Sequence, residues 1–151
     1  MKSKIIILLT FSVFLFGCGN SLKENKVEEV ATQEEHHHDH ESEAIELDKG
    51  KKWKVDDNMM VHIRTMENDV ANFNGTALTE HKTLSENLKK NIDLLTSNCT
   101  MKGKAHDELH KWLLPYIDLV DSFSEKKTEK EAAEKFQHIK KSFVTFNQYF
   151  Q

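Results

Sequence analysis

The chain has 151 residues, of which 30% are charged and 38% are hydrophobic, and it contains one proline and five glycines. A chain of this length accommodates one domain with short appendages, and the scarcity of proline and glycine favours helices. The formal net charge of −4 gives no indication of the basic surface typical of nucleic-acid binding, so we expect no nucleic-acid partner.

The first eighteen residues predict an export signal. Lys2 and Lys4 precede an apolar run over residues 5–16, which is too short for a comfortable bilayer span and is typical of a signal peptide. The run ends in Leu15-Phe16-Gly17-Cys18, which resembles the lipobox of bacterial lipoproteins. The resemblance implies removal of residues 1–17, acylation of Cys18 with fatty acids such as palmitate, and anchoring to a membrane of the cell envelope on its periplasmic or surface face. The alternative is an ordinary signal peptide with an incidental cysteine.

Residues 18–50 predict a tether between the lipid and the domain. The segment is polar and acidic and lacks apolar periodicity, so we expect it to be disordered. It carries a histidine cluster, His36, His37, His38 and His40, flanked by carboxylates. Clustered imidazoles suit zinc, copper or nickel ions, so the cluster predicts a weak, exchangeable metal site. The alternative is a solvated polar tract without a ligand.

From residue 51 onward the apolar residues recur at helical spacing. We expect helices over residues 56–73, 79–96 and 104–124, and a fourth that begins at the capping box Thr128–Glu131. Four helices of similar length with short connections favour antiparallel neighbours. The sequence therefore predicts an all-α, up-down-up-down four-helix bundle over residues 51–151.

Each expected helix has one predicted inner face. In the first three these faces are marked by Val55, Met59, Ile63, Met66, Val70 and Phe73; by Leu78, His81, Leu84, Leu88, Ile92 and Leu95; and by His106, His110, Leu113, Ile117 and Val120. In the fourth they are Ala132, Phe136, Ile139, Phe143, Phe146 and Phe150. The methionines and phenylalanines are most simply residues of the core.

The up-down-up-down topology brings several metal-binding residue types to one end of the bundle. His106 and His110 are four residues apart and leave the same helix face. Cys99 and Met101 precede them, and Met59 lies at the same end in the first helix. Thiol, thioether and imidazole ligands suit copper or zinc, so these five residues form the predicted metal site. The alternative is that the histidines are structural and that Cys99 is a small buried hydrophobe.

We expect no enzymatic activity. Residues 106–110 resemble the zinc-protease motif H-E-x-x-H, but Asp107 stands where that motif needs glutamate. The rest of the sequence shows no set of nucleophile and base, no glycine-rich phosphate loop and no paired buried carboxylates. A protein that binds a ligand or partner is therefore the expected class.

Three short motifs give a second resemblance. The stretches Asp57-Asn58-Met59, Glu131–Glu134 and Phe146–Tyr149 resemble the periplasmic four-helix b-type cytochromes. This resemblance implies a haem held by an early methionine, matched by Met59, and by a late histidine, for which this chain has Asn147. The alternative second ligand is His106 or His110, from the third helix. The stretch Cys99–Pro115 also resembles small uncharacterised bacterial lipoproteins.

The leading prediction is an envelope lipoprotein that binds or buffers copper or zinc at the bundle end. The first alternative is a haem-binding electron carrier, with haem less expected than a metal ion. The second is a structural or partner-binding lipoprotein without a cofactor, whose protein partner the sequence does not identify.

Overall fold

The structure, a computed structural model, describes residues 43–151. The predicted signal peptide, Cys18, and the tether histidines His36, His37, His38 and His40 lie outside the described residues. The described part consists of four helices, which are α1 (Asp57–Asn72), α2 (Leu78–Ser97), α3 (Lys104–Ser124) and α4 (Glu129–Tyr149).

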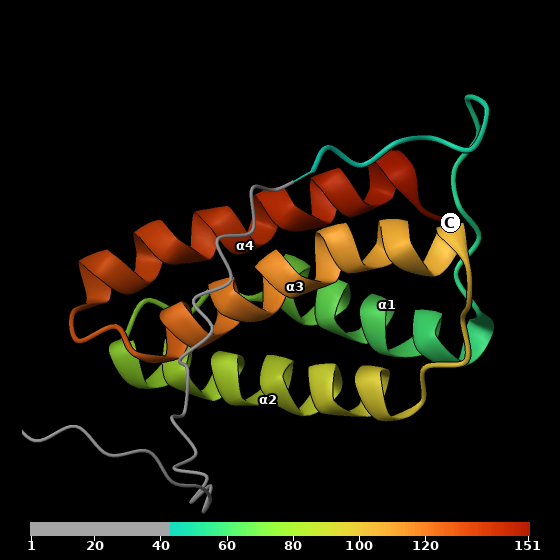
Figure 1. The fold of residues 1–151 in the computed structure, drawn as a ribbon. Coiled ribbons are helices and arrows are strands. Elements are labelled where there is room, and N and C mark those ends of the chain that lie inside the picture. Colours follow the sequence, from blue (N-terminus) through green and yellow to red (C-terminus); the bar gives the residue numbers. More distant parts are fainter. Residues whose placement is uncertain (1–42) are drawn as a thin grey trace, which may run out of the picture. The chain divides into compact units, whose positions relative to one another are not determined.

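The four helices form an antiparallel bundle (Figure 1). Consecutive helices pack against each other, and α1 also contacts α4, which closes the bundle. Residues 43–151 contain no strand, only two isolated bridges. The predicted all-α four-helix bundle is therefore confirmed, with helix bounds within one residue of those expected. No helix in this part of the chain is both long enough and apolar enough to cross a membrane.

Local signals in the sequence explain where two of the helices begin. At the start of α4, the Thr128 side chain accepts a hydrogen bond from the Glu131 backbone, and the Glu131 carboxylate accepts one from the Thr128 backbone. This reciprocal pair satisfies two backbone donors that the helix itself leaves open. Before α3, Gly103 adopts a φ of +67°, a conformation that other residues enter at an energetic cost.

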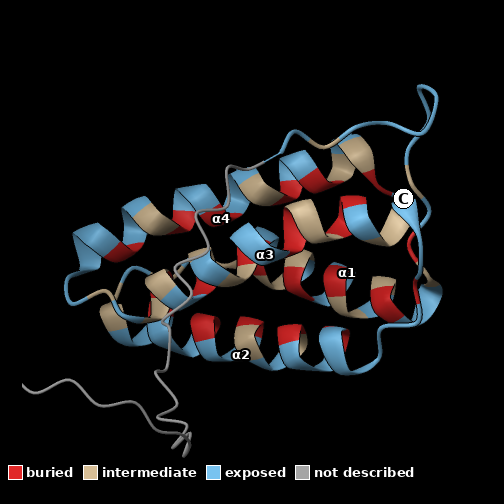
Figure 2. Ribbon diagram, in the orientation of Figure 1, coloured by how far each residue is buried: buried red, intermediate tan, exposed pale blue. Residues whose placement is uncertain are grey.

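The apolar face of each helix points into a single core (Figure 2). The core residues are Met59, Ile63, Met66 and Val70 in α1; Leu84, Leu88, Ile92 and Leu95 in α2; Leu109, Trp112, Leu113, Tyr116, Val120 and Phe123 in α3; and Ala132, Phe136, Ile139, Phe143 and Phe146 in α4. The inner faces predicted for α1, α2 and α4 are confirmed at these positions.

The inner face predicted for α3 is confirmed at Leu113 and Val120, but it is wrong at the two histidines, because the buried face is rotated by part of a turn. The buried residues centre on Leu109, Trp112 and Tyr116, whereas His106 and His110 are only half-buried. Trp112 stacks on Tyr116 with 4.9 Å between ring centroids. Because large aromatic side chains bury far more apolar area than imidazoles do, they set the rotation of α3 and leave the histidines on its flank.

Residues 43–55 form a strap that packs against the bundle. Within it, the Glu46 backbone N–H donates to the buried carboxylate of Glu108 in α3, at 2.8 Å. Farther along, Trp53 and Val55 exchange backbone hydrogen bonds with residues 149–151 at the end of the chain. The expectation of a disordered tether as far as Gly50 therefore fails for residues 43–50, because these backbone groups have partners in the bundle.

Candidate functional site

The predicted histidine pair lies on the first two turns of α3. The ring centroids of His106 and His110 are 4.2 Å apart, and the ring planes are tilted by 56°. The four-residue spacing accounts for this proximity, since it places both side chains one above the other on a helix. The structure thus brings the two imidazoles together at one end of the bundle, on an accessible flank of α3.

The surroundings of His110 favour its neutral form. Partial burial lowers the pKa of His110 from its usual 6.5, and the charge of His106 lowers it further, while Asp107 acts in the opposite direction. A neutral imidazole is the form that binds a metal ion. His110 therefore offers a lone pair at a lower pH than an ordinary histidine does.

The other predicted ligands lie in different environments. Cys99 is exposed in the connection between α2 and α3 and has no disulfide partner among residues 43–151. Met101 and Met59 are 8% and 1% exposed and belong to the hydrophobic core. Among residues 43–151, no three His, Cys, Asp or Glu side chains are grouped so that they could hold a metal ion. The described residues thus supply a pair of imidazoles rather than a closed ligand set.

Glu108 binds the strap. It lies between the two histidines in the sequence. Its carboxylate is 2% exposed and accepts hydrogen bonds from the Glu46 backbone and from the Lys111 ammonium group, at 2.8 and 3.0 Å. It leaves α3 on the flank that faces the strap, away from the imidazoles. This buried carboxylate was not identified in the sequence, where a charged residue at position 108 resembles an ordinary surface residue.

The bundle does not fit the haem implied by the cytochrome resemblance. Asn147 hydrogen-bonds to Arg64 and Glu67 of α1, so its side chain joins α4 to α1. Met59 is buried in the core. The interior is filled by packed rings, with Trp112 only 4.8 Å from Phe146 between centroids. These residues supply neither the second axial imidazole nor space for the macrocycle.

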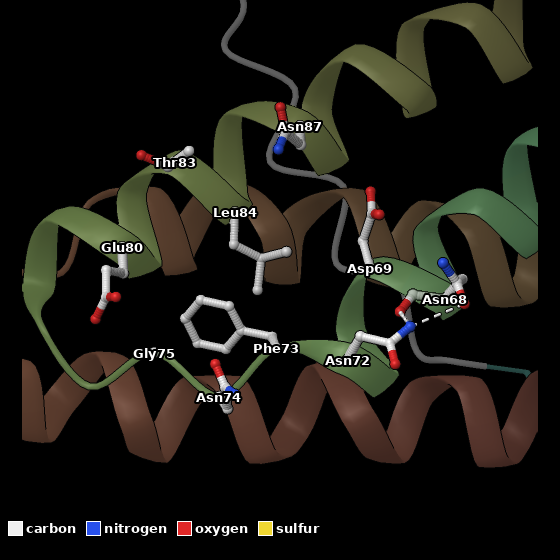
Figure 3. A pocket seen from close by; sticks show the side chains of 10 residues that line it. All are labelled: Asn68, Asp69, Asn72, Phe73, Asn74, Gly75, Glu80, Thr83, Leu84 and Asn87. Atoms are coloured by element: carbon white, nitrogen blue, oxygen red, sulfur yellow. Dashed lines mark hydrogen bonds between the residues drawn. The ribbon is translucent and has the colours of Figure 1, made fainter.

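Two surface hollows lie at the opposite end of the bundle, on either side of the connection between α1 and α2. The first has a volume of about 410 Å³ and is shown in Figure 3. It is lined by Asn68, Asp69, Asn72, Phe73, Asn74, Gly75, Glu80, Thr83, Leu84 and Asn87.

Several polar groups of this first hollow already have partners. The Asn72 amide donates to Asn68, and the Glu80 carboxylate accepts the backbone N–H groups of Thr76 and Ala77 at the start of α2. These hydrogen bonds cap and brace the ends of the two helices. The polar residues of this hollow therefore have a structural role that explains their presence without a ligand.

The second hollow has a volume of about 490 Å³ and lies between the same connection and α4. It shares Phe73, Asn74 and Gly75 with the first hollow, and it is also lined by His81 of α2 and Phe136 of α4. His81 is 3% exposed, as its predicted place on the inner face of α2 requires. Its position beside a hollow depends on how α4 packs, which the sequence of α2 does not encode.

Comparison with protein-family models, with curated proteins and with solved structures finds no match for this chain.

Proposed function

We propose that this protein is a lipid-anchored protein of the bacterial cell envelope that binds a transition metal ion, copper or zinc, through His106 and His110. The observation that carries the proposal is the pair of imidazoles on one accessible helix face, with 4.2 Å between their ring centroids. Two imidazoles one turn apart suit bidentate binding of a borderline ion, and water completes the coordination of an open site.

The open site favours exchange of the metal over permanent storage. A structural zinc site normally has four protein ligands, whereas the described residues provide two imidazoles on one helix. A soft group, the exposed thiol of Cys99, lies in the connection that precedes α3. The tether histidines, His36 to His38 and His40, would add a second, looser site. Both features support buffering of a metal ion at a membrane surface.

A zinc titration tests the site in α3. The test uses the whole chain with His36, His37, His38 and His40 replaced by asparagine, which removes the contribution of the tether. We expect His106→Ala with His110→Ala to weaken Zn²⁺ binding by about tenfold or more, because both ligands are lost. Binding in the parent chain should weaken as pH falls below about 6.5, since protons compete for the imidazoles. His110 should resist this competition because its pKa is lowered.

A matched pair of substitutions controls this titration. His62 in α1 and His138 in α4 are separate histidines on other helices, and replacing both with alanine removes the same number of imidazoles. Zinc affinity should stay within about twofold of the parent in this control. Equal loss in the two double variants would contradict the proposed site and would favour a cofactor-free lipoprotein that binds a protein partner.

The lipid anchor is tested by Cys18→Ser. The lipobox resemblance at residues 15–18 implies that the thiol of Cys18 carries the acyl chain, so serine should abolish labelling by radioactive palmitate. The variant should also leave the membrane fraction or keep its uncleaved signal peptide. Wild-type labelling and membrane partitioning in the variant would contradict the lipoprotein assignment.

A further inference from the structure

The second hollow, between the α1–α2 connection and α4, contains a buried histidine with an unused nitrogen. The Nδ1 atom of His81 lies 2.9 Å from the Ala77 carbonyl oxygen. Because a carbonyl oxygen only accepts hydrogen bonds, Nδ1 carries the proton, and Nε2 of the neutral ring is an acceptor. No described residue is hydrogen-bonded to Nε2. His81 lines the hollow, so a ligand in the hollow can supply the donor for this acceptor.

Aromatic rings hold the His81 imidazole in place. The ring of Phe73 meets it edge-on with 5.1 Å between centroids, and Phe123 and Phe136 follow at 5.8 and 6.3 Å. Phe73 and Phe136 also line the hollow. The imidazole therefore has a fixed orientation, and the same hollow presents apolar ring surface against which a flat ligand can pack.

The rim of the hollow has an excess of positive charge. Lys130 and Lys140 of α4 line it, together with one carboxylate, that of Glu129, while Glu134, outside the lining, approaches Lys130 at 4.0 Å. The Lys140 ammonium group lies 5.8 Å from the centre of the Phe136 ring, so it is held above the apolar wall. The first hollow, on the other side of the connection, has no lysine or arginine in its lining. The two ammonium groups thus distinguish the second hollow as one that suits an anion.

We propose that this hollow binds a small cyclic carboxylate that carries a hydrogen-bond donor at its far end. The carboxylate faces Lys130 and Lys140, the ring packs against Phe73 and Phe136, and the donor reaches Nε2 of His81. Each part of the ligand corresponds to a group that lines the hollow. The site lies at the end of the bundle opposite His106 and His110, so it is independent of the proposed metal binding.

The assignment of His81 is tested with two probes that differ by one hydroxyl group. 4-Hydroxybenzoate carries a carboxylate, a ring and a distal O–H donor, whereas benzoate lacks the donor. Both are titrated into the whole chain while the Ala133 methyl resonance, from another residue of the hollow, is followed by NMR. We expect saturable shifts and about fivefold tighter binding of 4-hydroxybenzoate, the gain that a single hydrogen bond provides.

Two sets of variants complete the test. His81→Phe keeps an aromatic ring but removes the acceptor, so it should erase the preference for 4-hydroxybenzoate. Lys130→Gln with Lys140→Gln should weaken both probes about threefold to tenfold, the range expected for two exposed charge contacts. The control, Lys135→Gln with Lys141→Gln, makes the same change in net charge at two α4 positions outside the hollow.

Three results would overturn the assignment. They are equal binding of the two probes by the parent chain, a preference that survives in His81→Phe, and equal weakening by the two lysine double variants. Lys130, Lys140 and Lys141 are exposed and Lys135 is half-buried, so we expect the lysine variants to stay folded, and the proposal remains testable even if His81→Phe unfolds. Zinc binding at the other end of the bundle should be unchanged throughout, which separates this site from the metal site.

Discussion

Replacement of Phe146 by alanine is expected to lower the free energy of unfolding by about 3–5 kcal/mol, the range for removing a large aromatic side chain from a core. Phe146 is fully buried in α4. Its ring centroid lies 4.8 Å from that of Trp112 and 5.1 Å from that of Phe150. The guanidinium of Arg64 lies 5.4 Å from the same ring. Alanine would leave a cavity where helices α1, α3 and α4 meet.

The matched control is Val144→Ala, two residues earlier in the same helix. Val144 is 71% exposed, so its truncation removes little buried area and should change stability by less than about 0.5 kcal/mol. Both variants are measured by urea unfolding followed by circular dichroism. A loss of less than about 1 kcal/mol for Phe146→Ala would show that the rings around position 146 do not form a packed core.

The helices and their inner faces could be predicted from the sequence because both are local properties. The alternation of apolar residues at spacings of three and four sets the inner faces of α1, α2 and α4. The capping box at Thr128 and the glycine at position 103 fix two helix starts. Short connections then leave antiparallel packing as the simplest arrangement.

The rotation of α3 could not be predicted from the same pattern, because apolar residues occur around much of its circumference. Two overlapping stripes are present, one through His106 and His110 and one through Leu109, Trp112 and Tyr116. Only the packing of the four helices decides between them, and the larger buried area of the aromatic residues decides in favour of the second. The prediction of the metal site depends on this rotation. Because the stripe through the aromatic residues faces the core, His106 and His110 lie on a flank of α3.

The position of the strap could not be predicted from the sequence either. Residues 43–50 are polar and lack periodicity, which is why the sequence predicts them as part of a tether. Their position instead depends on contacts with distant residues, among them the hydrogen bond to the buried carboxylate of Glu108, more than sixty residues later in the chain. A hydrogen bond over that separation leaves no local pattern in either segment.

Substitution of Glu108 by alanine should release the strap and lower the free energy of unfolding by about 1.5–3 kcal/mol, the range for hydrogen bonds to a charged group. The carboxylate accepts from the Glu46 backbone and from Lys111, and Lys111 also approaches Glu43 at 3.4 Å. Without Glu108, the Glu46 amide should exchange with solvent faster. The indole N–H of Trp53, which donates to the Glu46 carbonyl at 2.6 Å, should exchange faster as well.

Acid should release the strap in the wild-type protein in the same way. Burial raises the pKa of Glu108, but the Glu46 N–H and the Lys111 ammonium group outweigh it and hold the pKa below the usual 4.5. The unfolded carboxyl therefore takes up protons at a higher pH than the folded one. The contribution of Glu108 to stability is then full above about pH 4.5 and is lost as the pH falls through the lower pKa of the folded state.

The control for both measurements is Glu134→Gln in α4. The Glu134 side chain is 67% exposed, and its contact with Lys130, at 4.0 Å, is a surface ion pair of a kind that contributes little to stability. This variant should leave the exchange of the Glu46 amide unchanged at every pH. If Glu108→Ala behaved like this control, the strap would be held by its contacts with residues 149–151 and not by Glu108. Faster exchange in Glu108→Ala alone would mean that one buried carboxylate holds the strap against α3.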